Sequence, residues 1–314
     1  MPDAMVQAFV EDRVPGAALA EALGLPFAEI ALHRYPDGEI CPRVPGAAPT
    51  TIVYRSFDQP NEKLIALLLA QDAWRRDPRV RRLVLVAPYL PYLRQDIAFR
   101  PGEPVSQAVV CTLLAERFER IVTVDPHLHR TADLATAYPG TEWRVLSAQE
   151  AIAKALEAEG VPEGLIIIGP DVESGPLVTR LAERLGCMAA TFAKERAGDR
   201  TVHLTPPQGL VVAGRPVLIL DDMCSTGGTI ARVGEVLRAG GGARIEAIVT
   251  HALFDEPSAR LLREAGIARV RSTTSTDHPT NTIPLAGLLA GALADVIVGE
   301  VLGDKVLGGE EERA

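Results

Sequence analysis

The sequence predicts an α/β protein of two similar domains, each a mostly parallel β-sheet flanked by helices. Short runs of β-branched and other apolar residues alternate with amphipathic segments along most of the chain. This alternation is typical of parallel strands that are buried between helices. The runs are too numerous to divide naturally into one sheet, and 314 residues are enough for two ordinary domains.

The individual elements follow in order along the chain. Five short apolar runs bounded by turn residues predict buried strands. They lie at residues 80–89, 120–125, 165–171, 215–222 and 244–254. Five segments with apolar residues at helical spacing predict helices, at residues 61–76, 105–118, 147–160, 174–186 and 228–241. The first half thus reads β-α-β-α-β to Asp125, and the second half repeats the order from Leu165.

A domain boundary is predicted where YPGTEW, at residues 138–143, precedes a new helix. We therefore expect an N-terminal domain at residues 1–146 and a C-terminal domain at residues 147–314. An alternative keeps this boundary but returns roughly the last 25 residues to pack on the N-terminal domain.

Composition excludes several classes of protein. The net charge of −9 argues against a general nucleic-acid binder, because surfaces that follow phosphates are basic. None of the four cysteines forms a C-x-x-C pair, which fits a reducing cytoplasm better than a disulfide framework or a zinc site. No apolar run reaches about 18 residues, and the N-terminus lacks the pattern of a signal peptide. A cytoplasmic protein without a membrane partner is expected.

The segment VLILDDMCSTGGTI, at residues 217–230, carries the strongest functional signal. An apolar strand ends in two acids, and a turn rich in glycine and hydroxyl groups leads into a helix. Such a turn can direct successive N–H groups at a phosphate, which the positive end of the helix dipole also favours. The two carboxylates would repel a phosphate, so they must face ribose hydroxyls or a hydrated Mg²⁺. The segment therefore predicts a ribose 5-phosphate site, and a plain strand-to-helix turn is the alternative.

This segment resembles the phosphoribosyl pyrophosphate motif shared by type I phosphoribosyltransferases and ribose-phosphate pyrophosphokinases. Further stretches resemble the pyrophosphokinases specifically and occur in the family's order. They are HRYPDGEI (33–40), PYLPYLRQDIAFRPGEPVS (88–106), VDPHLHR (124–130), IIGPDVESG (167–175), FAKERAGDR (192–200) and THALF (250–254). Ser225, where many members have aspartate, is a variant of the archaeal-like branch. The resemblance implies two phosphoribosyltransferase-type domains.

The resemblance also implies roles for individual residues. For ribose 5-phosphate these are Asp221, Asp222, Ser225, Thr226, Gly227, Gly228 and Thr229. For ATP they are Arg94, Gln95 and Asp96, with Tyr35, Asp37 and Glu39 reaching the adenine of a neighbouring subunit. His127 and Asp171 would place Mg²⁺, and Lys194 and Arg196 would lie on a loop that closes over the reacting phosphates.

Several of these residues have a structural alternative when they are taken alone. Lys194 and Arg196 alternate, so an extended segment points them the same way, but they could also be solvated charges on a hairpin. Asp171 could merely cap the next helix. Magnesium prefers oxygen ligands, so His127 rests mostly on the resemblance. We interpret Cys224 as a packing residue. Ile97 and Ala98 stand where many members carry basic residues, so details of ATP contact can differ.

The expected reaction is direct transfer of the β,γ-diphosphoryl group of Mg-ATP to the C1 hydroxyl of ribose 5-phosphate. Catalysis would come from positioning, metal ions and the two loop cations. Three other functions are weighed: a phosphoribosyltransferase, a non-catalytic partner subunit of the synthases, and a regulator that senses phosphoribosyl pyrophosphate. None of them uses all of the quoted stretches. Sharing of the site between subunits implies a homo-oligomer, based on a dimer and extending in some family members to a hexamer.

Overall fold

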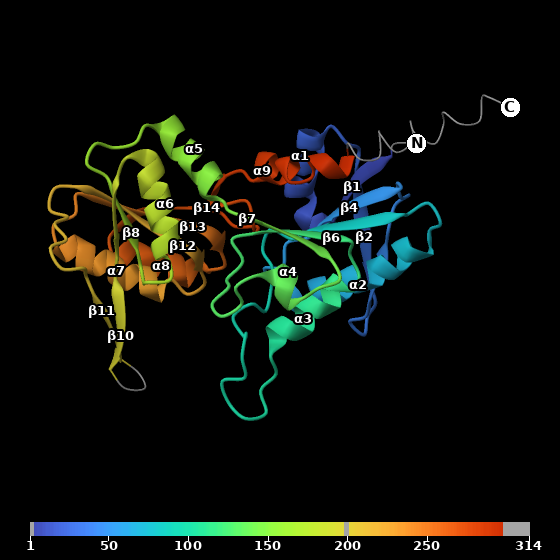
Figure 1. The fold of residues 1–314 in the computed structure, drawn as a ribbon, viewed down its shortest axis with the longest axis horizontal. Coiled ribbons are helices and arrows are strands. Elements are labelled where there is room, and N and C mark those ends of the chain that lie inside the picture. Colours follow the sequence, from blue (N-terminus) through green and yellow to red (C-terminus); the bar gives the residue numbers. More distant parts are fainter. Residues whose placement is uncertain (1–2, 198–200, 298–314) are drawn as a thin grey trace. The chain divides into compact units, whose positions relative to one another are not determined.

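The computed structural model describes residues 3–197 and 201–297, with the backbone alone at residues 194–197 and 201–204. The chain divides into two compact units (Figure 1). The first comprises the residues up to Leu146 together with the described residues from Ala286 on, and the second runs from Ser147 to Leu285.

The first unit is built on a seven-stranded sheet in the order β3-β2-β1-β4-β5-β6-β7. Its strands are β1 (Ala4–Phe9), β2 (Phe27–Arg34), β3 (Ile40–Arg43), β4 (Thr50–Tyr54), β5 (Arg82–Val86), β6 (Arg120–Val124) and β7 (Glu142–Leu146). Neighbouring strands are parallel except that β2 and β3 form an antiparallel pair. The chain order reverses between β1 and β4, which is the kind of switch point where open α/β sheets bind ligands.

Helices cover both faces of this sheet. In Figure 1, α1 (Arg13–Leu23) and α9 (Ala286–Gly291) lie on one face, and α2 (Pro60–Arg76), α3 (Ser106–Ala115) and the short α4 (Leu134–Ala137) lie on the other. A 3₁₀ turn, η1 (Val10–Asp12), links β1 to α1. Trp74 of α2 is fully buried in the core, and its indole N–H donates to Gln7 at 3.0 Å. That bond satisfies a buried polar group that would otherwise be costly.

The second unit is built on a six-stranded, all-parallel sheet in the order β15-β14-β13-β12-β8-β9. Its strands are β8 (Ile166–Gly169), β9 (Met188–Thr191), β12 (Pro216–Cys224), β13 (Arg244–Ala252), β14 (Ile267–Thr273) and β15 (Asn281–Ile283). A separate antiparallel hairpin is formed by β10 (Ala193–Ala197) and β11 (Thr201–Thr205). The helices of the second unit are α5 (Gln149–Glu159), α6 (Gly175–Leu185), α7 (Gly228–Ala239) and α8 (Glu256–Glu264).

The predicted elements are present, and the structure adds others. Each of the five predicted strands and five predicted helices overlaps a strand or helix of the structure. The β-α-β-α-β order predicted for the first half is too short, because β1 to β3 and α1 precede it. The α/β class with mostly parallel sheets is confirmed. Among the residues that the structure describes, no helix is long and apolar enough to cross a membrane.

Candidate active site

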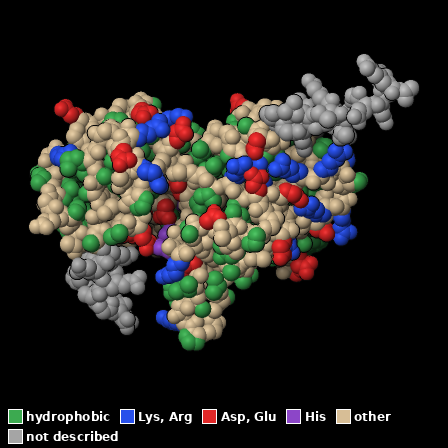
Figure 2. All heavy atoms as spheres, in the orientation of Figure 1, with side chains coloured by type: hydrophobic (Ala, Val, Ile, Leu, Met, Phe, Trp, Pro, Cys, Tyr) green, Lys and Arg blue, Asp and Glu red, His purple; other side chains and the backbone are tan. Residues whose placement is uncertain are grey.

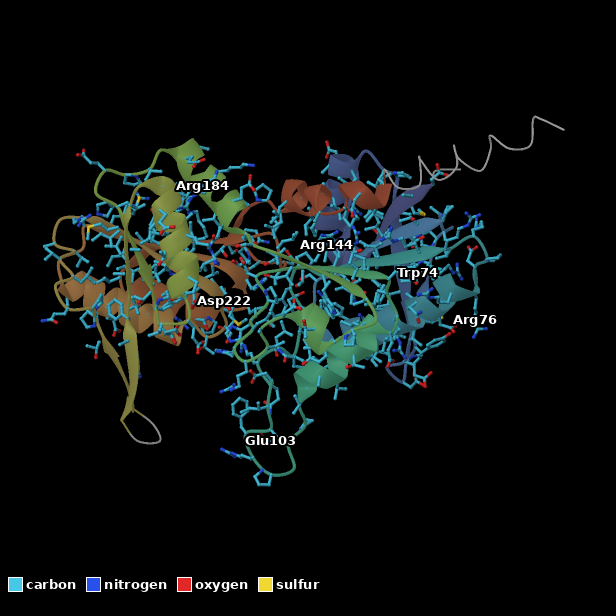
Figure 3. The ribbon with its side chains drawn as sticks, viewed as in Figure 1. Trp74, Arg76, Glu103, Arg144, Arg184 and Asp222 are labelled. Carbon is cyan, nitrogen blue, oxygen red and sulfur yellow. The ribbon has the colours of Figure 1, made fainter. Side chains whose placement is uncertain are left out.

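The end of β12 brings together the residues predicted to bind ribose 5-phosphate. The strand runs through both aspartates and ends at Cys224. Residues 225–227 make a short turn, and α7 begins at Gly228. Figure 3 shows Asp222 at this end of the strand. The acids therefore stand on a rigid strand, while the hydroxyl groups and glycines form the turn beyond it.

Gly227 determines the shape of this turn. Its φ is +70°, and a Cβ added to it would lie 3.2 Å from the side chain of Leu262. Glycine adopts this conformation without strain and leaves room for the leucine. The carbonyl of Gly227 accepts the N–H of Ala231 at 2.8 Å, which begins the helix. The first N–H groups of any helix have no acceptor within the helix, so an anion placed there gains hydrogen bonds and the positive end of the dipole.

Three carboxylates of the second unit influence one another at the ends of β8 and β12. The N–H of Asp222 donates to Oδ1 of Asp221 at 3.0 Å. The pKa of Asp221 is raised well above its ordinary value, first by burial and then by the charges of Asp222 and Asp171. Such a site favours a group that relieves the repulsion, such as a divalent cation or a sugar hydroxyl.

Asp171 also has the structural role that the sequence left open. Its Oδ1 accepts the backbone N–H of Glu173 at 3.1 Å and that of Ser174 at 3.3 Å, just before α6 begins. The preceding Gly169 is required for packing, since a Cβ there would lie 2.2 Å from Oγ of Ser174. The loop is therefore tightly built, and it holds Asp171 close enough to act on Asp221.

Cys224 packs as predicted. It is buried in the hydrophobic core of the second unit. Burial raises the pKa of its thiol to about 12. A thiol with this pKa remains protonated at neutral pH and is a poor nucleophile.

The backbone of Lys194 and Arg196 lies on β10. These residues pair across the hairpin with Leu204 and Val202. Their side chains lie outside the described part of the structure, so their predicted contact with phosphates stays a prediction. The two residues occupy alternate positions of this strand.

In the first unit, the loop between β5 and α3 carries the residues predicted to contact ATP. Figure 2 shows apolar side chains on this loop, and Tyr92, Ile97 and Phe99 are its exposed large hydrophobic residues. Gln95 and Asp96 are held inside it. The Gln95 amide donates to Ile97 O at 3.3 Å and to Glu103 at 3.2 Å. Arg94 is exposed.

Two further residues organise this loop, and neither is among the predicted site residues. Glu103, marked in Figure 3, accepts the N–H groups of Phe99 at 3.0 Å and Arg100 at 3.1 Å. Arg130 lies 2.9 Å from Oδ1 of Asp96, whose side chain is only 1% exposed. Arg130 stands in the quoted stretch VDPHLHR and Glu103 in the quoted GEP, so the motifs contained both. The partners of Glu103 are local, whereas Arg130 and Asp96 are 34 residues apart and only the fold brings them together.

Tyr35, Asp37 and Glu39 lie on the exposed turn between β2 and β3. The Tyr35 N–H donates to the Glu39 carbonyl at 2.8 Å, and Oδ1 of Asp37 accepts the Glu39 N–H at 3.1 Å. Gly38 has φ +93°, which completes the turn. The turn is thus internally ordered and presents its side chains outward.

The segment with His127 follows β6 through a strained residue. Asp125 has φ +37°, an uncommon value for a residue with a side chain, and its N–H donates to Leu146 O at 2.9 Å. The rings of His127 and His129 meet edge to face at 4.1 Å. Tyr92, in the loop predicted to bind ATP, has φ +63°. Strained residues of this kind cluster at functional sites.

Two family models match the chain. The model described as the N-terminal domain of ribose phosphate pyrophosphokinase matches residues 12–117, and that of the phosphoribosyl transferase domain matches residues 146–286. The first match covers the turn between β2 and β3 and the loop between β5 and α3. The second covers the carboxylates and the turn after β12.

Individual relatives align with nearly the whole chain. A ribose-phosphate pyrophosphokinase of Methanopyrus kandleri is 32% identical over 283 residues, which cover 90% of this chain and 95% of the relative. One of Thermococcus kodakarensis is 34% identical and covers 83% and 88% of the two chains. The crystal structure of phosphoribosylpyrophosphate synthetase from Mycobacterium smegmatis matches with a TM-score of 0.81 at 25% identity, covering 95% of this chain and 99% of that one.

Proposed function

The chain belongs to the ribose-phosphate pyrophosphokinase family, and from this premise we propose how it makes phosphoribosyl pyrophosphate. It is an enzyme that transfers the β,γ-diphosphoryl group of Mg-ATP to the C1 hydroxyl of ribose 5-phosphate, releasing AMP. The observation that carries the proposal is the turn after β12, where two strand-borne acids precede hydroxyl groups and a helix N-terminus. This turn suits one ligand that carries both a diol and a phosphate.

Ribose 5-phosphate would bind with its phosphate on the turn at residues 225–229 and its hydroxyls toward Asp221 and Asp222. The raised pKa of Asp221 supports this orientation, because hydroxyl donors would stabilise its charged form. The C1 hydroxyl would then attack the β-phosphorus in line, and AMP would leave from the opposite side. No covalent enzyme intermediate is required.

Magnesium fits the carboxylates that the second unit gathers. Asp171 and Asp221 repel each other, and an oxygen-binding cation would relieve that repulsion. Asp171 is the magnesium ligand that we propose in the second unit, and His127 is proposed separately as a candidate ligand in the first. When bound, the ion would neutralise charge on the diphosphoryl oxygens.

Lys194 and Arg196 are proposed to stabilise charge that develops during transfer. They occupy alternate positions of β10, two residues apart. An arginine placed on the transferring phosphoryl group accelerates comparable reactions by about 10³–10⁵-fold.

ATP would bind through Arg94, Gln95 and Asp96 on the loop between β5 and α3. The bonds from Glu103 and Arg130 support this role, since they preorganise the loop. Tyr35, Asp37 and Glu39 would contact the adenine bound to another subunit. Their exposure on an ordered turn suits contact with a second chain, so we also propose a homo-oligomer, dimeric or larger. The four free cysteines support a cytoplasmic setting.

The test is a coupled assay for AMP formed from Mg-ATP. We expect AMP release that requires ribose 5-phosphate, with phosphoribosyl pyrophosphate formed in equal amount. A phosphoribosyltransferase would instead consume phosphoribosyl pyrophosphate in the presence of a base. Release of ADP or of AMP without ribose 5-phosphate would contradict the proposal.

A further inference from the structure

A cavity of about 290 Å³ lies in the second unit, away from the candidate active site. It opens at the first residues of β12, β13 and β14 and beside the last turn of α5. Pro216, Val217 and Leu218 line it, whereas the acids of the candidate site stand at the other end of the same strand. The amino ends of the strands hold no residue to which the proposed reaction assigns a role.

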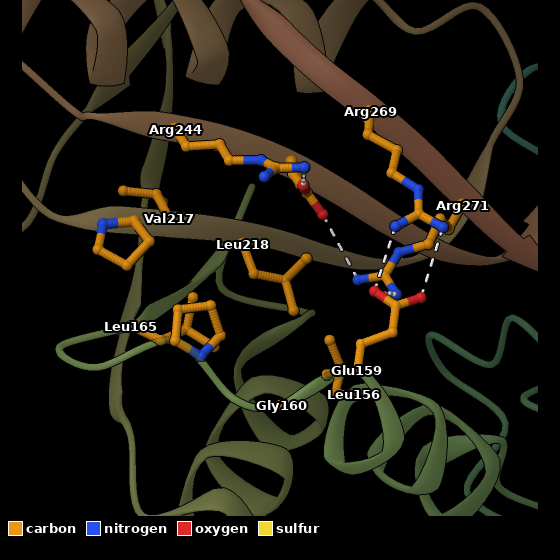
Figure 4. Close-up of a pocket in the computed structure, with 12 residues that line it drawn as sticks. Leu156, Glu159, Gly160, Leu165, Val217, Leu218, Arg244, Arg269 and Arg271 are labelled. Atoms are coloured by element: carbon orange, nitrogen blue, oxygen red, sulfur yellow. Dashed lines mark hydrogen bonds and ion pairs between the residues drawn. The ribbon is translucent and has the colours of Figure 1, made fainter.

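The cavity has one apolar wall and one charged wall (Figure 4). Leu156, Leu165, Val217 and Leu218 form the apolar wall. The charged wall contains three arginines and two glutamates, so it carries a net charge of +1. These residues are Arg244, Arg269, Arg271, Glu159 and Glu246. The combination suits a small ligand with an apolar body and a single negative group.

Arg271 is the centre of the charged wall. It is only 2% exposed, and its Nε and Nη1 make no hydrogen bond with any residue in the described ranges, although Nη1 lies 3.1 Å from Oε2 of Glu159. Its Nη2 lies 3.5 Å from Glu246. Burial is the largest cause of a lowered pKa for this guanidinium. Burying an arginine whose donors lack well-aligned acceptors is costly, and an acceptor with better geometry would lower that cost.

Glu159 occupies the place that such an acceptor would take. Its carboxylate is 3.2 Å from Nη1 of Arg269 and 3.1 Å from Nη1 of Arg271, and Figure 4 shows both arginines converging on it. Its side chain is 48% exposed and stands at the end of α5, where it can turn toward solvent. Glu246 would stay paired with Arg271 when a ligand binds, because its side chain is only 16% exposed.

We propose that this cavity binds a small organic monocarboxylate. Its carboxylate would replace that of Glu159 on Arg269 and Arg271, and its short apolar body would lie on Leu156, Leu165 and Leu218. A planar carboxylate matches the guanidinium fork. Inorganic phosphate has no apolar body to lie on these leucines, so it would use only the charged wall. The site is independent of the reaction proposed above.

The test is a titration of the full chain with 4,4,4-trifluorobutyrate, followed by ¹⁹F NMR. Saturable binding is expected, with competition by hexanoate. Arg271→Gln should weaken binding at least about tenfold, since hydrogen bonds to charged groups are worth roughly 1.5–3 kcal/mol. Arg269→Gln should weaken it about fivefold, since exposed ion pairs are worth up to about 1 kcal/mol. Arg269 is 40% exposed, so its variant should fold even if the Arg271 variant does not.

Glu159→Gln gives the most decisive test, because this substitution should strengthen binding of the probe, whereas the arginine substitutions should weaken it. It removes the internal competitor and one negative charge, so binding should tighten by about threefold to fivefold. Arg260→Gln, an exposed arginine on α8, is the matched control and should leave binding unchanged. No saturation below about 10 mM, or a Glu159→Gln variant that binds no tighter, would overturn the proposal. So would inorganic phosphate that displaces the probe more strongly than hexanoate does.

Discussion

Asp221 lies in an environment that destabilises its charged form unless a ligand is bound. Burial and two neighbouring carboxylates raise its pKa well above the ordinary 3.8. Because the folded-state pKa is raised, its contribution to stability is complete below the unfolded value and is lost as pH rises through the folded value. Ionising this side chain in the free protein therefore costs folding free energy, and active sites often retain this kind of cost.

Replacing this acid should stabilise the protein while abolishing its activity. Asp221→Asn should raise the free energy of unfolding by about 1 kcal/mol at pH 7.5, with the gain vanishing near pH 3.5. Denaturant unfolding at several pH values measures it. Asp277→Asn, which changes an exposed carboxylate in the same unit, is the control. A destabilised Asp221→Asn variant at pH 7.5 would argue against the assigned repulsion.

Gly227 and Gly214 distinguish two reasons why a position requires glycine, backbone conformation and lack of space for a side chain. Both have φ near +70°, but a Cβ at Gly214 meets nothing within 4 Å, whereas one at Gly227 would press on Leu262. Gly214→Ala should cost about 1 kcal/mol of stability from backbone conformation alone. Gly227→Ala should cost a further 1–2 kcal/mol, roughly, for the displaced leucine. Thermal unfolding of both variants tests this, and equal costs would remove the steric argument.

At the scale of elements, Arg130 joins the segment after β6 to the loop between β5 and α3. It neutralises Asp96, whose side chain is almost completely buried. Arg130→Gln should raise the KM for ATP about tenfold, with a smaller change in kcat, because the loop loses a charged hydrogen bond of roughly 1.5–3 kcal/mol. Arg263→Gln, which breaks an exposed ion pair on α8, should leave both constants unchanged. An unaltered KM in the Arg130 variant would exclude this positioning role.

The hairpin of β10 and β11 gives a separate kinetic prediction. Lys194→Ala should lower turnover by about two orders of magnitude or more while leaving ribose 5-phosphate binding nearly intact. Calorimetry with ribose 5-phosphate and the AMP assay measure the two effects. Lys154→Ala is the matched control, since Lys154 is exposed and paired with Glu150 on α5. Near-normal turnover would refute the catalytic role of Lys194.

The sequence predicted best those elements whose signal is local. The turn after β12 combines a buried strand, two acids and a glycine-rich helix start, so its arrangement could be foreseen from residues 217–230 alone. β2 escaped prediction because its residues are mostly exposed or half-buried, which gives no continuous apolar run. The support of Asp96 by Arg130 could not be foreseen, since the partners are 34 residues apart. Contacts between residues so far apart in sequence depend on the order of the strands in the sheet.

At the scale of the whole molecule, the first unit is made of two separate stretches of sequence. α9 packs on α1, and Arg120 of β6 holds Asp295 through two bonds of 2.6 and 2.8 Å. Arg120 is only 4% exposed, whereas Asp295 is 55% exposed. The guanidinium lowers the pKa of Asp295 to about 2. A lowered pKa gives stability that is present above the unfolded value of 3.8 and lost as pH falls toward 2.

Breaking this pair should loosen the C-terminal stretch. Asp295→Asn should lower stability at pH 7 by about 0.5–1 kcal/mol, the range for partly exposed pairs, and the difference should shrink below pH 4. Hydrogen exchange in α9 should also become faster. Asp77→Asn is the control, because the pKa of Asp77 is likewise about 2 but its partner Arg79 is two residues away. Unchanged exchange in α9 would show that Asp295 does not hold this stretch.

The return of α9 to α1 also affects the order of events during synthesis. A ribosome releases α1 early and α9 only after the entire second unit has emerged. The apolar side of α1 therefore stays exposed to solvent, or is shielded by a chaperone, while more than half of the polypeptide is still being translated. Residues 147–285 face no such delay, since they form one continuous stretch that can mature as soon as it leaves the exit tunnel.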